Sequence, residues 1–412
     1  MPSPSSNRNP LIRLILPIYA PALIFAIGNG TIMPVLTLAA LSVGFDKSGS
    51  SAVMGLLGFA GIAMSPPIGR IIAHIGDRAA LICGSVISLA SLSGFLWSLH
   101  YHSHPATRTV FVVATILLAL GANTWSLARQ AYVAEAVPVH WRARGLSTLG
   151  GMTRIGVLVG PLLATGLLAI WALDSIFIVN IVLVVLAALL VIGYVLPEPT
   201  ATLHTPSENH TEGEIHRSRL STAILGVALN CLTVLRANRT VIVPLWGTAQ
   251  GYEPHFITGT FAVTALVDTI MFVVSGAVMD RRGRHWALIP SFIFMPIGII
   301  VMLCWNTPIG FVVGAAILGF GNGFGAGIVM TVGADLCPPE HRAEFLGLWQ
   351  AIVAIGAACG PFIISGLTRL FTLSVGLWAT VGIGIFGLIW TIVFLESAYR
   401  RLGVNLRGQS LD

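Results

Sequence analysis

Twelve long apolar runs restrict the fold of this chain more than any other feature of its sequence. Each run approaches the roughly twenty residues that an α-helix needs to cross the hydrocarbon core of a bilayer. Only 9% of the residues are charged, whereas a soluble domain has roughly 25%. We therefore predict an all-α membrane protein with twelve transmembrane helices, near residues 14–41, 51–75, 79–99, 109–134, 146–171, 175–196, 219–247, 256–279, 287–305, 309–334, 345–370 and 375–395.

The basic residues are divided unevenly between the two sets of connecting loops. Fifteen of the 22 lie in the set that includes the termini, three lie in the opposite set, and four lie inside predicted helices. Because loops rich in Lys and Arg remain in the cytoplasm, we expect both termini there, in a multi-pass protein of the cell (inner) membrane. The net charge of +6 then reflects topology, and we expect no nucleic-acid partner.

Four segments of the first half recur in the second half, in the same order and displaced by 200 to 210 positions. The pairs are Pro34 with Pro244, "GRIIAHIGDR" (Gly69–Arg78) with "GAVMDRRGRH" (Gly276–His285), "EAVPVHWRA" (Glu135–Ala143) with "DLCPPEHRA" (Asp335–Ala343), and "GVLVGP" (Gly156–Pro161) with "GAACGP" (Gly356–Pro361). Such an ordered series indicates a duplication. We predict two pseudo-symmetric six-helix bundles, 1–196 and 219–395, joined by a polar cytoplasmic linker, 197–218, and followed by a cytoplasmic tail, 396–412.

The repeated motifs carry a resemblance to a known family. The Gly-x-x-x-Asp-Arg-x-Gly-Arg series from Gly276 to Arg284 is similar to the signature of the major facilitator superfamily, and "GVLVGPLLATG" resembles a motif of its drug and metabolite antiporters. The resemblance implies two bundles around a central cavity that opens alternately to each side of the membrane. The first-half copy departs from the signature at Ala73 and His74.

Charged residues at the predicted cytoplasmic helix ends are candidates for gating. Carboxylates there, Glu135 and Asp335 among them, can hold neighbouring helix ends to arginines through ion pairs that break in each cycle. The alternative is that these arginines only anchor the topology. The candidates are Asp77, Arg78, Glu135, Arg142, Asp280, Arg281, Arg284, Asp335 and Arg342.

Glycines at four-residue spacing, each pair followed by a proline, predict two sites of close helix packing. Small residues let helix backbones approach closely, and the proline removes a backbone hydrogen bond and permits bending. The residues are Gly156, Gly160, Pro161, Gly356, Gly360 and Pro361.

Five charged residues lie inside predicted helices, where each costs at least about 2.5–3.5 kcal/mol near the centre of the bilayer. They are Arg129, Arg154, Arg236, Arg239 and Asp268. Arg236 and Asp268 match in depth and are expected to pair, whereas Arg239, aligned with Asn29 of the first half, has no acidic partner within sequence reach. Snorkelling and purely structural ion pairs are the alternatives. Four cations against one anion make the interior net positive, and these residues with Asn29 are the candidates for substrate binding and coupling.

The sequence therefore predicts a secondary active transporter rather than an enzyme, since phosphate-binding, hydrolase and metalloprotease motifs are missing. We expect proton-coupled efflux of small amphiphilic compounds or drugs, anionic ones among them, by a monomer in the lipid bilayer. The alternatives are an uptake carrier for an organic anion or other metabolite, and a non-transporting receptor. No cofactor or metal is expected, because the "HYHSH" series from His100 reads as a solvated loop.

Overall fold

The structure is a computed structural model that describes residues 14–137, 139–195, 212–325, 327–336, 342–402 and 406. Within these ranges, the side chains of 134–135, 139–144, 147, 212–219, 280, 334, 342–348 and 350 are not described. The gating candidates Glu135, Arg142, Asp280 and Arg342 therefore lie outside the described side chains.

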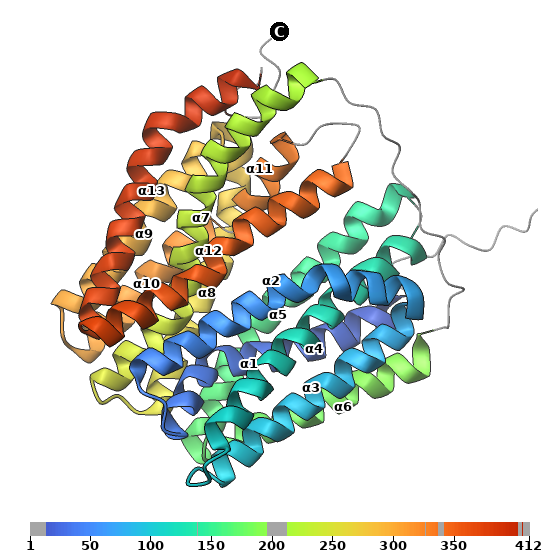
Figure 1. Ribbon diagram of the computed structural model, residues 1–412, viewed down its shortest axis with the longest axis vertical. Coiled ribbons are helices and arrows are strands. Elements are labelled where there is room, and N and C mark those ends of the chain that lie inside the picture. Colours follow the sequence, from blue (N-terminus) through green and yellow to red (C-terminus); the bar gives the residue numbers. More distant parts are fainter. Residues whose placement is uncertain are drawn as a thin grey trace, which may run out of the picture. The chain divides into compact units, whose positions relative to one another are not determined.

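Helices make up the described chain, and no strand occurs in it (Figure 1). The first half contains a π-helical turn, Ile15–Tyr19, and then α1 (Ala20–Ser42), α2 (Lys47–Ile75), α3 (Asp77–His100), α4 (Thr107–Ala136), α5 (Val139–Ile170) and α6 (Asp174–Tyr194). The second half contains α7 (Glu212–Ala249), α8 (Pro254–Arg282), α9 (His285–Cys304), α10 (Pro308–Phe324), α11 (Ile328–Leu336), α12 (Arg342–Leu370) and α13 (Leu373–Arg401). Twelve spans long and apolar enough to cross a membrane are present, which confirms the predicted fold class.

The described residues form two compact units. The first contains the chain up to Val35 and from Ala63 through α6, and the second contains Leu36–Ile62 and the helices from α7 onward. The predicted domain boundaries stay predictions, although α7 begins at Glu212, inside the expected linker. The apolar pattern that marks a span starts only near residue 219, and a helical turn outside the membrane needs no such pattern.

Helix α5 packs against α1 without intervening side chains in the first unit, at the predicted glycines. A Cβ atom on Gly160 would lie 2.7 Å from the backbone nitrogen of Thr31, and one on Gly156 would overlap the backbone of Ala26. In the second unit, a Cβ on Gly360 would lie 2.6 Å from Asn238 Oδ1. The close packing predicted from the glycine spacing is therefore confirmed in both units.

The tenth span is broken, which differs from the predicted continuous helix over 309–334. Helix α10 ends at Phe324 and α11 begins at Ile328. Glycines at alternate positions from 319 to 327 weaken the helix there, since each costs about 1 kcal/mol relative to alanine. Side chains satisfy the carbonyl groups at the break: Ser275 Oγ donates to the Phe324 oxygen at 2.6 Å, and Arg236 Nη1 donates to the Gly325 oxygen at 3.2 Å.

Candidate functional site

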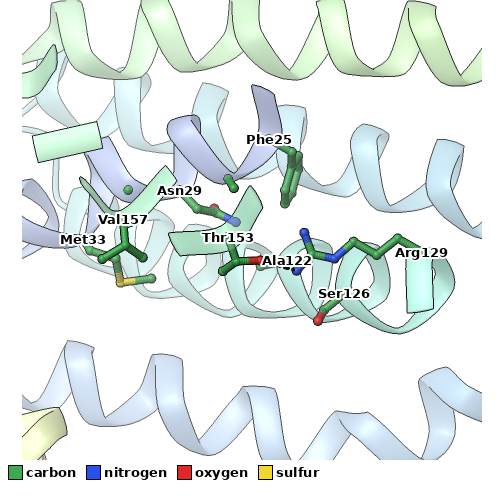
Figure 2. Close-up of a pocket in the computed structure, with 10 residues that line it drawn as sticks. Phe25, Asn29, Met33, Ala122, Ser126, Arg129, Thr153 and Val157 are labelled. Carbon is green, nitrogen blue, oxygen red and sulfur yellow. Dashed lines mark hydrogen bonds between the residues drawn. The ribbon is translucent and has the colours of Figure 1, made fainter. Parts of the chain in front are cut away.

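A cavity of about 160 Å³ opens within the first unit, between α1, α4 and α5 (Figure 2). Four of its lining residues are polar, and the others are apolar or small. None of them is acidic. The residues are Phe25, Ala26, Asn29, Gly30, Met33, Ala122, Ser126, Arg129, Thr153 and Val157.

Arg129 is the only charged residue of this cavity. Its Nη2 donates to Thr153 Oγ1 at 3.2 Å, and Thr153 Oγ1 in turn donates to the Leu149 carbonyl at 3.1 Å. The Nε atom of Arg129 is buried and has no hydrogen-bond partner. No carboxylate of the described residues forms an ion pair with Arg129. The guanidinium group therefore retains unused N–H donors and an uncompensated positive charge beside the cavity.

The other polar side chains of the cavity lie around this cation. Figure 2 shows the Arg129 guanidinium near Thr153, with Asn29 on the neighbouring α1 and with Met33 and Val157 at the far end. Asn29 makes no hydrogen bond to another described residue, so its amide is available as donor and acceptor. Ser126 Oγ accepts from Gln130 Nε2 at 3.1 Å. The cavity thus has a cationic, hydrogen-bonding end and an apolar end.

Phe25 forms one wall of the cavity and is backed by Trp125. The Phe25 ring, on α1, stacks on Trp125 of α4 with a centroid separation of 4.5 Å and an interplanar angle of 10°. Trp125 is fully buried, and its Nε1 donates to Ser85 Oγ at 2.9 Å. Because Trp125 is fixed by packing and by this hydrogen bond, Phe25 has a fixed position as well.

The structure brings two of the predicted substrate or coupling candidates of the first half, Asn29 and Arg129, into one cavity. Arg154, half-buried on α5, follows the lining residue Thr153 but does not itself line the cavity. Sequence reasoning missed Phe25 and Ser126. Their spacing of three or four residues from Asn29 and Arg129 on the same helices could have identified them, because such positions share a helix face.

The charged residues of the second unit pair differently from the prediction. Arg239 Nη1 lies 3.7 Å from Asp268 Oδ2, and the two side chains are only 9% and 4% exposed. The Arg239 guanidinium also lies over the Phe261 ring, 5.6 Å from its centroid. The expectation that Arg239 has no acidic partner is therefore wrong. It failed because Arg239 is one turn from Arg236 on α7, and both side chains are long enough to reach α8. Arg236 Nη1 donates to the Gly325 carbonyl at the break of the tenth span.

A second ion pair ties α11 to the turn between α8 and α9. Arg284 donates through Nε to Asp335 Oδ2 at 2.8 Å and through Nη2 to Oδ1 at 3.0 Å. Tyr399 of α13 donates to the same carboxylate at 2.9 Å. The hydrogen bonds to Asp335 raise the pKa of the Arg284 guanidinium, so this group stays charged. The prediction that Asp335 is a carboxylate partner of these arginines is confirmed.

The corresponding turn of the first half, between α2 and α3, makes different contacts from the turn between α8 and α9. Arg78 donates to the Ile192 carbonyl at 2.8 Å, at the end of α6, and Asp77 begins α3. In the second half, the backbone N–H of Arg284 donates to the Leu406 carbonyl at 2.8 Å, and Arg281 is exposed. The degenerate first-half signature thus corresponds to a different set of contacts.

A known protein family matches this chain across both halves. The family model described as Major Facilitator Superfamily matches residues 20–266 and 225–409, which together span both six-helix halves. The chain belongs to the Major Facilitator Superfamily. It is therefore a multi-pass transport protein rather than an enzyme, and the family resemblance of its motifs is confirmed.

Several members of the superfamily are similar to this chain along much of its length. A multi-drug resistance efflux pump PmrA homolog of Lactococcus lactis is 21% identical over 396 residues, which cover 90% of this chain and 92% of that protein. An uncharacterized MFS-type transporter of Bacillus subtilis, YhjO, is 23% identical and is matched over 77% of its length, by 76% of this chain. Two uncharacterized MFS-type transporters of Mycobacterium tuberculosis are matched over only 28% of their length, at 23% identity and by 45% of this chain.

Solved structures of the superfamily share the fold. A POT family transporter in complex with 5-aminolevulinic acid superposes with a TM-score of 0.77 at 12% identity, over 97% of this chain and 99% of that one. A D-xylose-proton symporter superposes with a TM-score of 0.72 at 14% identity, over the same shares. At these identities the similarity shows the fold alone. The ligand has to be inferred from the residues of this chain.

Proposed function

We propose that this transporter binds a small amphiphilic anion beside Arg129 and moves it across the cell membrane, with both termini in the cytoplasm and protons as the coupling ion. The single observation that supports an anionic substrate is the Arg129 cation, which faces a cavity without acidic residues. The distribution of Lys and Arg between the loops supports the placement of the termini.

The cost of burying charge explains why Arg129 is suited to an anion. A cation inside the membrane costs at least about 2.5–3.5 kcal/mol near the bilayer centre, and an ion pair recovers part of that cost. Arg239 has such a partner in Asp268. Arg129 has a neutral hydroxyl, from Thr153. A bound carboxylate, sulfonate or phosphate would accept its remaining N–H groups and compensate its charge, while the apolar end would accommodate the rest of an amphiphile.

Asp268 is the residue that we propose for proton coupling. It lies midway along α8, only 4% exposed, and a carboxyl group can be charged in one stage of the cycle and neutral in another. Arginine cannot release its proton under these conditions. Protonation of Asp268 would weaken its attraction to Arg239 and so change the packing of α7 on α8.

Export in exchange for protons is the direction that we propose. It is supported by the similarity to the Lactococcus lactis efflux pump homolog along 90% of the chain and by the glycine–proline motif of α5. Uptake of an organic anion would use the same cavity, and measurement of the direction of flux distinguishes the two.

Flux of labelled organic anions in proteoliposomes under an imposed pH gradient tests the proposal. Arg129→Gln should raise the apparent KM roughly ten- to hundredfold, because a hydrogen bond to a charged group contributes about 1.5–3 kcal/mol. Arg129→Lys should keep part of the function. Arg108→Gln, the same change on the exposed start of α4, is the matched control. Equal transport of anions by Arg129→Gln and Arg108→Gln would sink the anion site.

A further inference from the structure

We propose that the ligand of the Arg129 cavity is an aromatic monocarboxylate, whose single carboxylate contacts Arg129, whose six-membered ring packs on Phe25, and whose size is limited by Ala122. The inference rests on the proposed anion site and deepens it, because it names the substrate class and a residue that determines specificity.

The lining charges select one negative charge. Arg129 is the only cation of the cavity, and the other polar lining residues, Asn29, Ser126 and Thr153, are neutral. A second carboxylate on the opposite side of the ring would lie towards Met33 and Val157, at the end away from the guanidinium (Figure 2). Burying a charge among apolar groups without a partner is strongly unfavourable. Ligands with carboxylates at both ends are therefore excluded, and monoanions are bound in one orientation.

The volume of the cavity selects one ring. At about 160 Å³, it is close to the roughly 150 Å³ apolar cavity that is known to take one benzene molecule. The Arg129 end is suited to the carboxylate, and the attached ring would lie next to it, on the side where Figure 2 draws Phe25. A fused two-ring ligand exceeds this volume.

The aromatic wall selects a flat ring. One face of Phe25 is covered by Trp125, so the rest of the Phe25 ring is the part that lines the cavity. Aromatic pairs favour offset-stacked or edge-to-face geometry, and a wall that does not move offers this contact without further ordering cost. A planar aromatic ring gains more from such a wall than a puckered saturated ring of equal size.

We assign the size limit to Ala122, the small residue that α4 contributes to the lining. Gly30 cannot take this role, since a Cβ there would overlap the Gly156 carbonyl. The repeat counterpart of Ala122, 200 positions later, is Asn322. A larger side chain at this site is thus compatible with the helix, and a leucine at 122 would occupy the space of the ring.

Binding to the purified full-length protein in nanodiscs, by titration calorimetry, tests the inference. The probes are benzoate, acetate, cyclohexanecarboxylate, terephthalate and benzyl alcohol. Benzoate should bind at least about tenfold more tightly than acetate or cyclohexanecarboxylate, which corresponds to about 1.4 kcal/mol. Terephthalate, with its second carboxylate on the opposite side of the ring, and benzyl alcohol should bind no better than acetate. Ala122→Leu should lose the preference for benzoate and retain acetate, whereas Ala136→Leu, the same change at the exposed end of α4, should behave like the parent protein.

Each other result overturns a defined part of the inference. Equal affinity for benzoate and acetate, both lost in Arg129→Gln, would remove the aromatic class and leave the anion site in place. Terephthalate binding as tightly as benzoate would remove the limit to one charge. Unchanged benzoate binding in Ala122→Leu would remove Ala122 as the size limit, and Ala122→Val provides a smaller change if the leucine variant fails to fold. If Arg129→Gln binds benzoate like the parent, or if no carboxylate binds, the proposed anion site itself fails.

Discussion

The contact between α1 and α5 makes a quantitative prediction about one methyl group. In Gly160→Ala, the new Cβ would lie 2.7 Å from the Thr31 backbone nitrogen and closer still to the backbone of Gly30. These neighbours are main-chain atoms, which cannot rotate away as a side chain can. Gly166 lies on the same helix, and a Cβ there would meet nothing within 4 Å. The two substitutions are chemically identical and differ only in this surrounding space.

The magnitude follows from two opposing terms. Forcing an extra carbon into a packed interior typically costs about 1–3 kcal/mol, and a contact this short with backbone places Gly160 at the upper end. Replacing glycine with alanine inside a helix returns about 1 kcal/mol. We therefore expect Gly160→Ala to lose about 2 kcal/mol of stability and Gly166→Ala to gain up to about 1 kcal/mol.

Unfolding of the purified variants in one detergent, followed by intrinsic fluorescence against denaturant, measures the difference. The second half provides an independent comparison on α12, where Gly356 corresponds to the contact glycine Gly156 and Gly366 to Gly166. A Cβ on Gly356 would lie 3.0 Å from the Asn230 Cα, whereas one on Gly366 meets nothing within 4 Å. The Gly356→Ala and Gly366→Ala variants should therefore diverge in the same direction. Equal unfolding midpoints within either pair would refute the idea that these glycines are required for helix contact.

Three further predictions concern polar groups. Asp268→Asn should abolish accumulation driven by a pH gradient and retain downhill exchange of substrate; a variant as stable as the parent that still accumulates substrate would exclude Asp268 from coupling. Asn322→Leu should raise stability by about 1 kcal/mol or more, because Asn322 is 2% exposed and its Oδ1 has no hydrogen-bond partner in the described part of the chain. Asn180→Leu should lower stability, since its amide donates to the Gly28 carbonyl and the Thr31 hydroxyl; the reverse order in thermal unfolding would contradict this reasoning. Asp335→Ala should lower the free energy of unfolding by roughly 3–5 kcal/mol, because it leaves Arg284 buried without its counter-ion. Combining Asp335→Ala with Arg284→Met should recover part of that loss. Equal destabilisation of the single and double variants would speak against the ion pair.

The twelve spans and the helix contacts could be predicted because crossing a bilayer requires sequence patterns that can be recognised directly. An apolar run of sufficient length has few alternatives to a spanning helix, and four-residue glycine spacing has a direct packing meaning. The broken tenth span could not be predicted from apolar runs, because hydropathy continues through Gly325. Its break depends on Ser275 and Arg236, which lie far away in the sequence and bond to its carbonyl groups.

The candidate site was predictable only in part. Burial cost identified Arg129 and Asp268 as exceptional residues, because charge is rare inside spans. Depth alone did not separate the two neighbouring arginines of α7, since a side chain of that length reaches more than one turn. The stacked pair of Phe25 and Trp125 could not be recognised in the sequence either. Two aromatic residues among many apolar ones look like ordinary core residues, and their contact becomes evident only when their helices are placed side by side.

The break between α10 and α11 has a consequence for how a duplicated chain changes shape. Its counterpart in the first half, α4, is one uninterrupted rod from Thr107 to Ala136, whereas the tenth span has a joint at Gly325. A continuous helix transmits a displacement along its whole length, whereas an interrupted span lets α11 rotate while α10 stays in place. Because α11 carries Asp335 and its bond to Arg284, we expect rotation at the joint to act on that bond. The two halves share repeated motifs, yet the interruption lies in the tenth span and not in α4, so motion within one half need not be copied by the other.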